Sequence, residues 1–249
     1  MNWRAALLAV AVVLGGSITP AGAVELVVYS STGMQAALTD IQPLYERKTH
    51  NKLAMTFLTA NQVKDKLDAG AAFDVAIVLP PVTEQLIAAG KIEPGIVPLA
   101  KSGLGIAFKE GAQAPDVSTP DGFKAALLHA DSVAFTTTGQ SGLYLARLLE
   151  RWDIADQVKA KATAIPSGST AAYVAKGQAD MAIQLLAELH AVPGVQIFPF
   201  PAAVQNFLKF QGSISPTSTH KKTGASFLKF LSTPAAVKVL RAKYMEPGN

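Results

Sequence analysis

The sequence predicts an α/β fold made of two lobes, with a ligand site between them. Strand-like and helical segments alternate along the chain, and this alternation favours parallel sheets with helices on both faces. Four turns rich in Ser, Thr and Gly each follow a strand-like segment and open a helix, two in each half of the chain. Ligands of such sheets bind outside the carboxyl ends of the strands. We therefore expect the four turns to face one another across the boundary between the lobes.

The clearest of these turns lies in the stretch 136–152, TTTGQSGLYLARLLERW. The apolar run 132–135 before it predicts a buried strand, and apolar residues at helical spacing after it predict a helix. A helix N-terminus carries unpaired backbone N–H groups and the positive end of the helix dipole. Hydroxyl groups around it add donors, so the turn predicts an anion-binding site. Simple capping of the helix is the alternative.

The other three turns follow the strand-like segments 25–30, 53–58 and 162–165. In the turn after 53–58, Thr59 is as plausible a helix cap as Asn61 is a ligand-binding residue. A buried amide needs hydrogen-bond partners, and a ligand can supply them to Gln184 at the end of the segment 180–185. The candidate ligand-binding residues are Ser31, Thr32, Gly33, Asn61, Thr138, Gln140, Ser141, Ser169, Thr170 and Gln184.

The remaining segments complete the alternation. Pro43 lies within the predicted helix 34–50, where a proline predicts a kink or a late break. We expect the extended segments 104–108 and 206–214 to cross between the lobes. The other predicted strands are 73–79 and 195–200, and the other predicted helices are 61–67, 82–89, 120–129, 170–177, 186–190, 225–231 and 234–244.

Composition excludes several classes of protein. The chain has 249 residues, of which 49% are hydrophobic, and it contains no cysteine. Disulfides and thiolate metal sites are therefore absent. The net charge is only +4 and the basic residues are scattered, whereas a nucleic-acid-binding protein needs a basic stripe. The four histidines do not form a metal-binding motif, so we expect neither a metal nor a cofactor.

The N-terminus has the features of a secretory signal peptide over residues 1–23. Arg4 supplies the positive charge, 5–15 is an apolar run too short to span a bilayer, and Ala21-Gly22-Ala23 fits the cleavage rule. We expect cleavage after Ala23, a mature chain from Val24, and a periplasmic location.

With these segments identified, the mature chain resembles the periplasmic solute-binding proteins of ABC importers, and in particular the molybdate-binding family. The resemblance is carried by VVYSSTGMQAALTDI, DAGAAFDVAIV, GQSGLYLARLLERWDIAD, AYVAKGQADMAIQ and FLKFLSTPAAVKVLRAKYMEPG. It implies two lobes, each a mixed, mostly parallel sheet flanked by helices, joined by two crossing strands. The first lobe would comprise 24–103 plus 207–249, and the second 104–206.

The resemblance also implies a function. Such a protein is a monomer that engulfs a small anion as its lobes close and then docks on a membrane permease. The same fold serving a sensor instead of an importer is a second possibility. Ser141 falls where this family places a backbone donor of the second lobe.

An enzyme is the alternative from another class, because aconitate isomerase is similar to molybdate-binding proteins. The stretch 139–143 lacks the G-x-S-x-G spacing of a nucleophile elbow. An isomerase would need a general base, and the four turns offer only hydroxyls, amides and N–H groups. The base would have to come from elsewhere, such as Glu188 or His190.

The sequence departs from the molybdate-binding family at two positions. Gly33 stands where that family presents a hydroxyl, and Leu185, or Gln184 in the neighbouring register, stands where it presents a tyrosine. We interpret Gly33 as leaving room beside the ligand and predict a small organic carboxylate instead of molybdate or tungstate. Neutral donors and helix dipoles would hold it, since no arginine lies in the turns.

Overall fold

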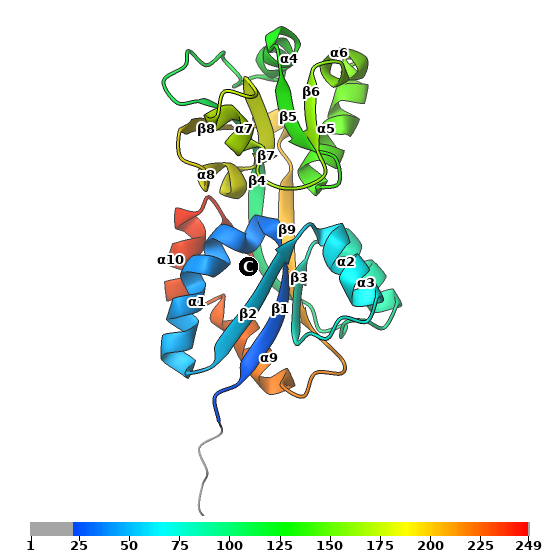
Figure 1. Ribbon diagram of the computed structural model, residues 1–249, viewed down its shortest axis with the longest axis vertical. Helices are drawn as coiled ribbons and strands as arrows, with labels where there is room; N and C mark the ends of the chain where they lie inside the picture. The colour runs from blue at the N-terminus through cyan, green and yellow to red at the C-terminus, as the bar shows by residue number, and fades with distance from the viewer. Residues whose placement is uncertain (1–21, 249) are drawn as a thin grey trace, which may run out of the picture.

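The computed structural model describes residues 22–248 and confirms the mixed α/β fold. Two lobes are stacked along the long axis of the molecule, and two strands run between them, β4 (Val97–Lys109) and β9 (Phe207–Ile214) (Figure 1). The predicted signal peptide lies outside the described residues, apart from Gly22 and Ala23.

The lower lobe in Figure 1 is built from both ends of the chain. Its elements are β1 (Glu25–Ser31), η1 (Thr32–Met34), α1 (Gln35–Thr49), β2 (Lys52–Leu58), α2 (Ala60–Asp68), β3 (Val75–Val78), α3 (Pro80–Ala88), α9 (Lys221–Phe230), α10 (Pro234–Ala242) and β10 (Glu246–Pro247).

The upper lobe is built from the middle of the chain. Its elements are α4 (Pro120–His129), β5 (Val133–Thr136), α5 (Gln140–Arg151), α6 (Ala155–Lys159), β6 (Ala162–Ile165), α7 (Ala171–Ala175), β7 (Met181–Leu185), α8 (Leu186–His190), β8 (Val195–Pro199) and η2 (Ala202–Val204).

The strand order β2-β1-β3-β9-β4-β7-β5-β6 joins both lobes through β4. Within the lobes, β1 is parallel to β2 and β3, and β5 is parallel to β6 and β7. The strand β4 is antiparallel to β9 over 97–103 and then to β7 and β8 over 104–109. The crossing strand is therefore longer than the segment 104–108 predicted from the sequence. The division of the chain into 24–103 plus 207–249 and 104–206 stays a prediction.

The side chain of Gln205 supports β4 where it changes partners. Its Oε1 accepts a hydrogen bond from the Leu104 backbone N–H at 2.8 Å, and its Nε2 donates to the Leu104 carbonyl at 3.0 Å. The amide thus pairs with the backbone much as a neighbouring strand would. Gly103 leaves space for it, because a Cβ at this position would lie 3.2 Å from the Gln205 amide.

Helix α1 shows how the apolar pattern builds the lower core. Ala37, Leu38, Ile41 and Tyr45 lie on one face and are fully buried. Tyr45 packs edge-on against Phe227 and Phe230 of α9, with ring centroids 5.0 and 5.4 Å apart. The helix continues through Pro43 to Thr49, so the chain is not broken at the proline. Other corrections are small: α9 begins at Lys221 rather than 225, and α6, η2 and β10 were not expected.

Gly142 allows α5 to begin directly against the end of β5. A Cβ at Gly142 would lie 1.6 Å from the carbonyl oxygen of Thr136, a backbone atom that cannot rotate away. Glycine is therefore required here by the close approach of helix and strand.

We predict that Gly142→Ala lowers the free energy of unfolding by about 1–3 kcal/mol, because the backbone must shift to accept the methyl group. Thermal unfolding of the two proteins measures the difference. Gly95→Ala is the matched control, since a Cβ at Gly95 meets nothing within 4 Å. Equal melting temperatures for Gly142→Ala and the parent would contradict the prediction.

Candidate functional site

Two adjoining cavities lie between the lobes. The larger, of about 420 Å³, and the smaller, of about 40 Å³, are lined in common by Thr32, Gly33, Gly168, Gln184 and Glu188. Because they share these residues, we treat them as one cleft, with residues of η1 and α1 on one side and of the upper lobe on the other. The site thus falls where the turns were expected to meet.

The smaller cavity is lined by the N-termini of two helices. Gly139, Gln140 and Ser141 begin α5, and Thr59 and Ala60 begin α2. Gly139 has no side chain with which to cap α5, so the first N–H groups of the helix lack side-chain partners at its start. Exposed N–H groups and the positive helix end favour an anion at this position.

Thr59 caps α2 as the sequence indicated. Its Oγ1 accepts a hydrogen bond from the Gln62 N–H at 3.3 Å, and the Gln62 side chain accepts one from the Thr59 N–H at 3.0 Å. This reciprocal pair is a capping box. Asn61 lies one residue beyond the cavity wall and lines neither cavity, so Thr59 and Ala60 take its expected place.

Two hydroxyls of the cleft are buried without a partner. These are Oγ1 of Thr136, which lines the smaller cavity, and Oγ of Ser169, which lines the larger. Buried polar groups almost always have hydrogen-bond partners, so both are available to a ligand. Thr136 was not among the predicted residues, because a run of three threonines does not indicate which one faces the site.

The neighbouring Thr138 does not face the cleft. Its Oγ1 donates to the carbonyl of Pro166 at 2.6 Å, and the Thr137 N–H donates to the carbonyl of Ile165. These bonds tie the turn after β5 to the turn after β6. The prediction of Thr138 as a ligand-binding residue therefore has no support in the geometry, whereas Gln140 and Ser141 do line the site.

Gln184 and Thr170 satisfy one another. The Oε1 of Gln184 accepts hydrogen bonds from both the backbone N–H and the Oγ1 of Thr170, each at 2.9 Å, and its Nε2 donates to the Gly168 carbonyl at 3.0 Å. Thr170 is completely buried and lines neither cavity. Gln184 does line the cleft, but its first role is to shape the turn after β6.

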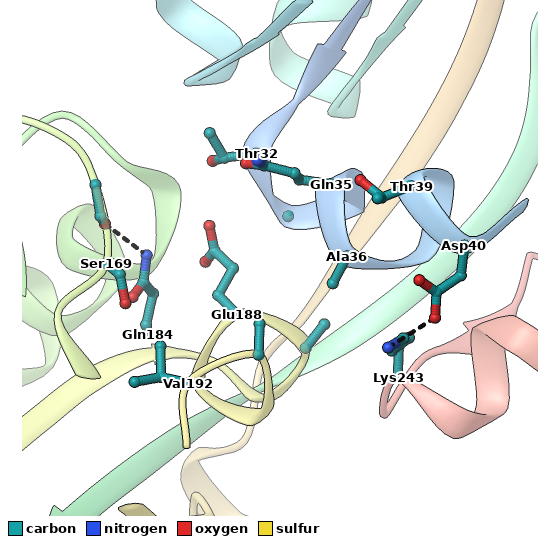
Figure 2. A pocket seen from close by; sticks show the side chains of 14 residues that line it. Thr32, Gln35, Ala36, Thr39, Asp40, Ser169, Gln184, Glu188, Val192 and Lys243 are labelled. Carbon is teal, nitrogen blue, oxygen red and sulfur yellow. Dashed lines mark hydrogen bonds and ion pairs between the residues drawn. The ribbon is translucent and has the colours of Figure 1, made fainter. Parts of the chain in front are cut away.

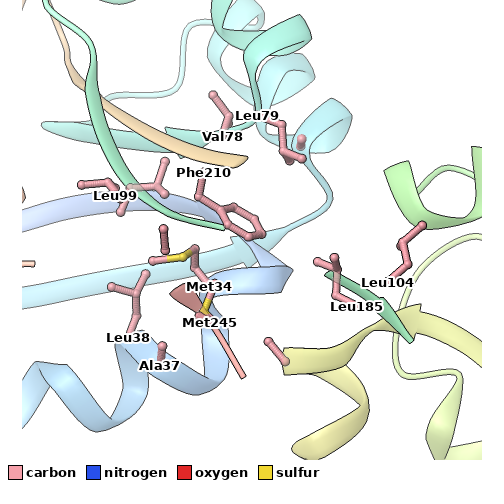
Figure 3. Packing of buried hydrophobic residues seen from close by; sticks show 14 of the residues in the cluster. Met34, Ala37, Leu38, Val78, Leu79, Leu99, Leu104, Leu185, Phe210 and Met245 are labelled. Carbon is pink, nitrogen blue, oxygen red and sulfur yellow. The ribbon is translucent and has the colours of Figure 1, made fainter. Parts of the chain in front are cut away.

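The first turn brings Ser31, Thr32 and Gly33 to the cleft as predicted, but the interpretation of Gly33 as spare room is wrong. A Cβ at Gly33 would lie 2.5 Å from Cζ of Phe210 and 2.7 Å from Cδ1 of Leu185. Figure 3 shows these two side chains on either side of the start of the first helical segment. Glycine is needed because both side chains already fill the space.

Glu188 is the functional candidate that the set of binding residues omitted. It lies on α8, four residues after Gln184, and its carboxyl group points across the larger cavity toward Thr32 (Figure 2). Burial disfavours its charged form and raises its pKa from 4.5 to about 7, against hydrogen bonds from Thr32, Leu185 and Gln184 that favour the charge. This carboxyl group exchanges its proton near neutral pH.

The described residues contain neither a cluster that could hold a metal ion nor a helix that could span a membrane. Within 22–248, no cluster of three or more His, Asp or Glu side chains could hold a metal ion. No helix in the same part of the chain is long and apolar enough to cross a membrane.

With this geometry established, comparisons with known proteins define its class. A family model for bacterial extracellular solute-binding proteins matches residues 26–246. The chain belongs to this family.

Individual relatives differ in what they do. An aconitate isomerase from a Pseudomonas species is 31% identical over 230 residues, covering 89% of this chain and 87% of that protein. The molybdate-binding protein of Azotobacter vinelandii has a TM-score of 0.76 at 19% identity, covering 88% of this chain and 98% of its own. A sulfate-binding protein of Mycobacterium tuberculosis has a TM-score of 0.74 at 14% identity, covering 90% and 87%. The last two establish a shared fold.

We predict that Glu188→Gln changes how stability depends on pH. The folded-state pKa of Glu188 is raised from 4.5 to about 7, so between these values the folded protein holds a proton that the unfolded chain releases. The parent therefore loses stability as pH rises through this window, and the glutamine variant does not lose this contribution. The gap in unfolding free energy should grow from near zero at pH 4.5 to on the order of 2–3 kcal/mol above pH 7. Urea unfolding at several pH values measures it; parallel curves would contradict it.

Proposed function

We propose that this protein captures a small organic polycarboxylate between its lobes in the periplasm and delivers it to the permease of an ABC importer. The observation that carries the proposal is the cleft itself, where the N-termini of α2 and α5 approach from different lobes. The unpartnered hydroxyls of Thr136 and Ser169, both from the upper lobe, also line it. Membership of the solute-binding family supports capture without chemistry.

The size of the cleft favours an organic acid over a tetrahedral oxyanion. The smaller cavity, at the N-termini of α2 and α5, suits one anionic group. The larger adds about 420 Å³, which lies in the range of small-molecule sites and leaves room for a carbon skeleton. The similarity to an aconitate isomerase supports the same class of ligand, since aconitate is a tricarboxylic acid.

Ligand screening tests the proposal. We expect di- and tricarboxylates to raise the melting temperature, because a ligand that binds only the folded state stabilises it. Molybdate, tungstate, sulfate and phosphate should have smaller effects. Small-angle scattering should show a smaller radius of gyration with the bound acid, as the lobes close. Stabilisation by molybdate alone would overturn the choice of ligand.

We predict that Ser141→Leu weakens binding of the best acid at least about tenfold. Ser141 is 4% exposed at the start of α5, so leucine would both remove a donor and fill the smaller cavity. A hydrogen bond to a charged ligand contributes roughly 1.5–3 kcal/mol, which corresponds to a tenfold or larger change in affinity. Calorimetry measures the change. Ser226→Leu is the control, because Ser226 is exposed on α9 and lines neither cavity. Equal affinities for Ser141→Leu and the parent would place the anion elsewhere.

Isomerisation of the captured acid is a second candidate function, and Glu188 favours it. A group with a pKa of about 7 is half-ionised near neutral pH, as efficient proton transfer requires. Its carboxylate would remove a proton from a carbon next to a carboxylate of an unsaturated acid. The double bond would move by one carbon, and the same proton would return at the far end of the allylic system.

The two candidates predict opposite effects of pH. Capture alone predicts that affinity for a polycarboxylate falls as pH rises through 7, because ionised Glu188 repels the ligand; Glu188→Gln should abolish this fall. Isomerisation predicts that turnover rises over the same range, because only the carboxylate can accept a proton, and that Glu188→Gln is inactive. Proton NMR of cis-aconitate in D₂O, with the protein at pH 6 and pH 8, separates them. Absence of any trans isomer or deuterium exchange at either pH would exclude isomerisation of this acid.

A further inference from the structure

The larger cavity is elongated along the start of the first lobe. Thr32, Ala36, Thr39 and Asp40 all line it, and they follow one another along η1 and the first turns of α1 at helical spacing. At 1.5 Å per residue, eight residues of helix extend about 12 Å. A ligand anchored at the N-terminus of α5 therefore has an open path along α1.

Lys243 stands at the far end of this path. Figure 2 shows its side chain reaching the cavity beside Asp40, and its Nζ lies 2.8 Å from the Asp40 Oδ2. Of the described residues that line the two cavities, Lys243 is the only one with a positive charge. The inner end of the cleft offers neutral donors, so the two ends differ in chemistry.

The chain around Lys243 is held in place from both lobes. Tyr244, at a left-handed φ of 56°, turns the chain sharply after α10. Its ring packs against His190 of α8, with centroids 4.7 Å apart and the ring planes tilted by 47°. The Oγ of Ser102 donates to the Tyr244 carbonyl at 3.2 Å and accepts from the Ala187 N–H at 3.3 Å. The strand β4 and the helix α8 therefore hold the chain next to Lys243, and α8 also lines the cleft through Ala187 and Glu188.

Asp40 does not hold Lys243 strongly. The side chain of Asp40 is 50% exposed, against 26% for Lys243, and exposed ion pairs contribute little because water and salt screen them. A lysine ammonium has three donors and one of them suffices for Asp40. A ligand carboxylate that enters the cavity can bind the remaining donors or replace Asp40.

We propose that Lys243 binds a second carboxylate of the ligand, so that the protein selects acids with two anionic groups spaced along the cleft. This inference rests on the proposed capture of a polycarboxylate and names the residue that sets its selectivity. One carboxylate occupies the N-terminal end of α5, the carbon skeleton lies along α1, and the second carboxylate reaches Lys243.

Three variants and matched ligands test the proposal. Lys243→Gln removes both the cation and its ion pair, whereas Asp40→Asn removes the same ion pair and keeps the cation. Arg241→Gln removes an equal charge from an exposed position two residues earlier, in the last turn of α10. Calorimetry with tricarballylate, glutarate and glutaramate compares them, since glutaramate is glutarate with one carboxylate replaced by an amide.

We expect Lys243→Gln to lower the affinity for tricarballylate and for glutarate at least about tenfold, because a hydrogen bond to a charged group is lost. The variant should also bind glutarate no more tightly than glutaramate. Asp40→Asn should bind as tightly as the parent or more tightly, and Arg241→Gln should match the parent. If Lys243→Gln binds the acids as tightly as the parent does, the proposed role of Lys243 is overturned, while the proposed function still stands. Equal weakening in Asp40→Asn would assign the pair a structural role. Failure of the parent to bind any of these acids would instead overturn the proposed function.

Discussion

The change of partner within β4 is the constraint on which the cleft depends. One strand pairs with β9 through Gly103 and with β7 and β8 from Leu104, so both lobes share a single continuous backbone at their boundary. At this point the Gln205 amide adds hydrogen bonds to both backbone groups of Leu104. The Leu104 N–H also donates to the Asn206 carbonyl, and the Leu104 carbonyl accepts from the Phe200 N–H. Because β4 fixes how the lobes are oriented, the turns after β1, β5 and β6 face one another.

The cleft holds charge without a buried counter-ion at its inner end. Helix N-termini and hydroxyls supply partial positive charge there, and Glu188 remains protonated below a pH of about 7. A protonated carboxyl group donates a hydrogen bond where an ionised one would repel an anion. The full positive charge of Lys243 lies at the outer end, where it pairs with the half-exposed Asp40 and solvent screens the pair.

Apolar side chains, as well as polar groups, set the shape of the cleft. Phe210 of β9 and Leu185 of β7 both lie against Gly33. Side chains from a crossing strand and from an upper-lobe strand therefore border the cleft beside the first turn. Close packing of this kind transmits any displacement of one lobe to the other, because interiors at this density do not deform freely. The first turn and the lobe boundary are thus packed against one another.

The amino-acid sequence by itself determined most of the elements of this protein and the order in which they occur. Alternating apolar runs, the apolar face of α1 and the capping box at Thr59 are local patterns, and such patterns locate the longer helices and strands. The short elements α6, η2 and β10 carry no such pattern. The local patterns also located the four turns and therefore the region of the site.

Tertiary structure alone decided which side chains in those turns are free to bind. Thr136 and Thr138 are chemically identical, yet their hydroxyls differ. The Thr138 hydroxyl donates to the carbonyl of Pro166, 28 residues away, whereas the Thr136 hydroxyl has no hydrogen-bond partner. Gly33 gained no space, because Phe210 and Leu185 reach it from distant strands. Lys243 joins the site only through the fold that returns the C-terminus to α1. Whether a polar group is available depends on what lies against it, and that is set by contacts between segments far apart in the chain.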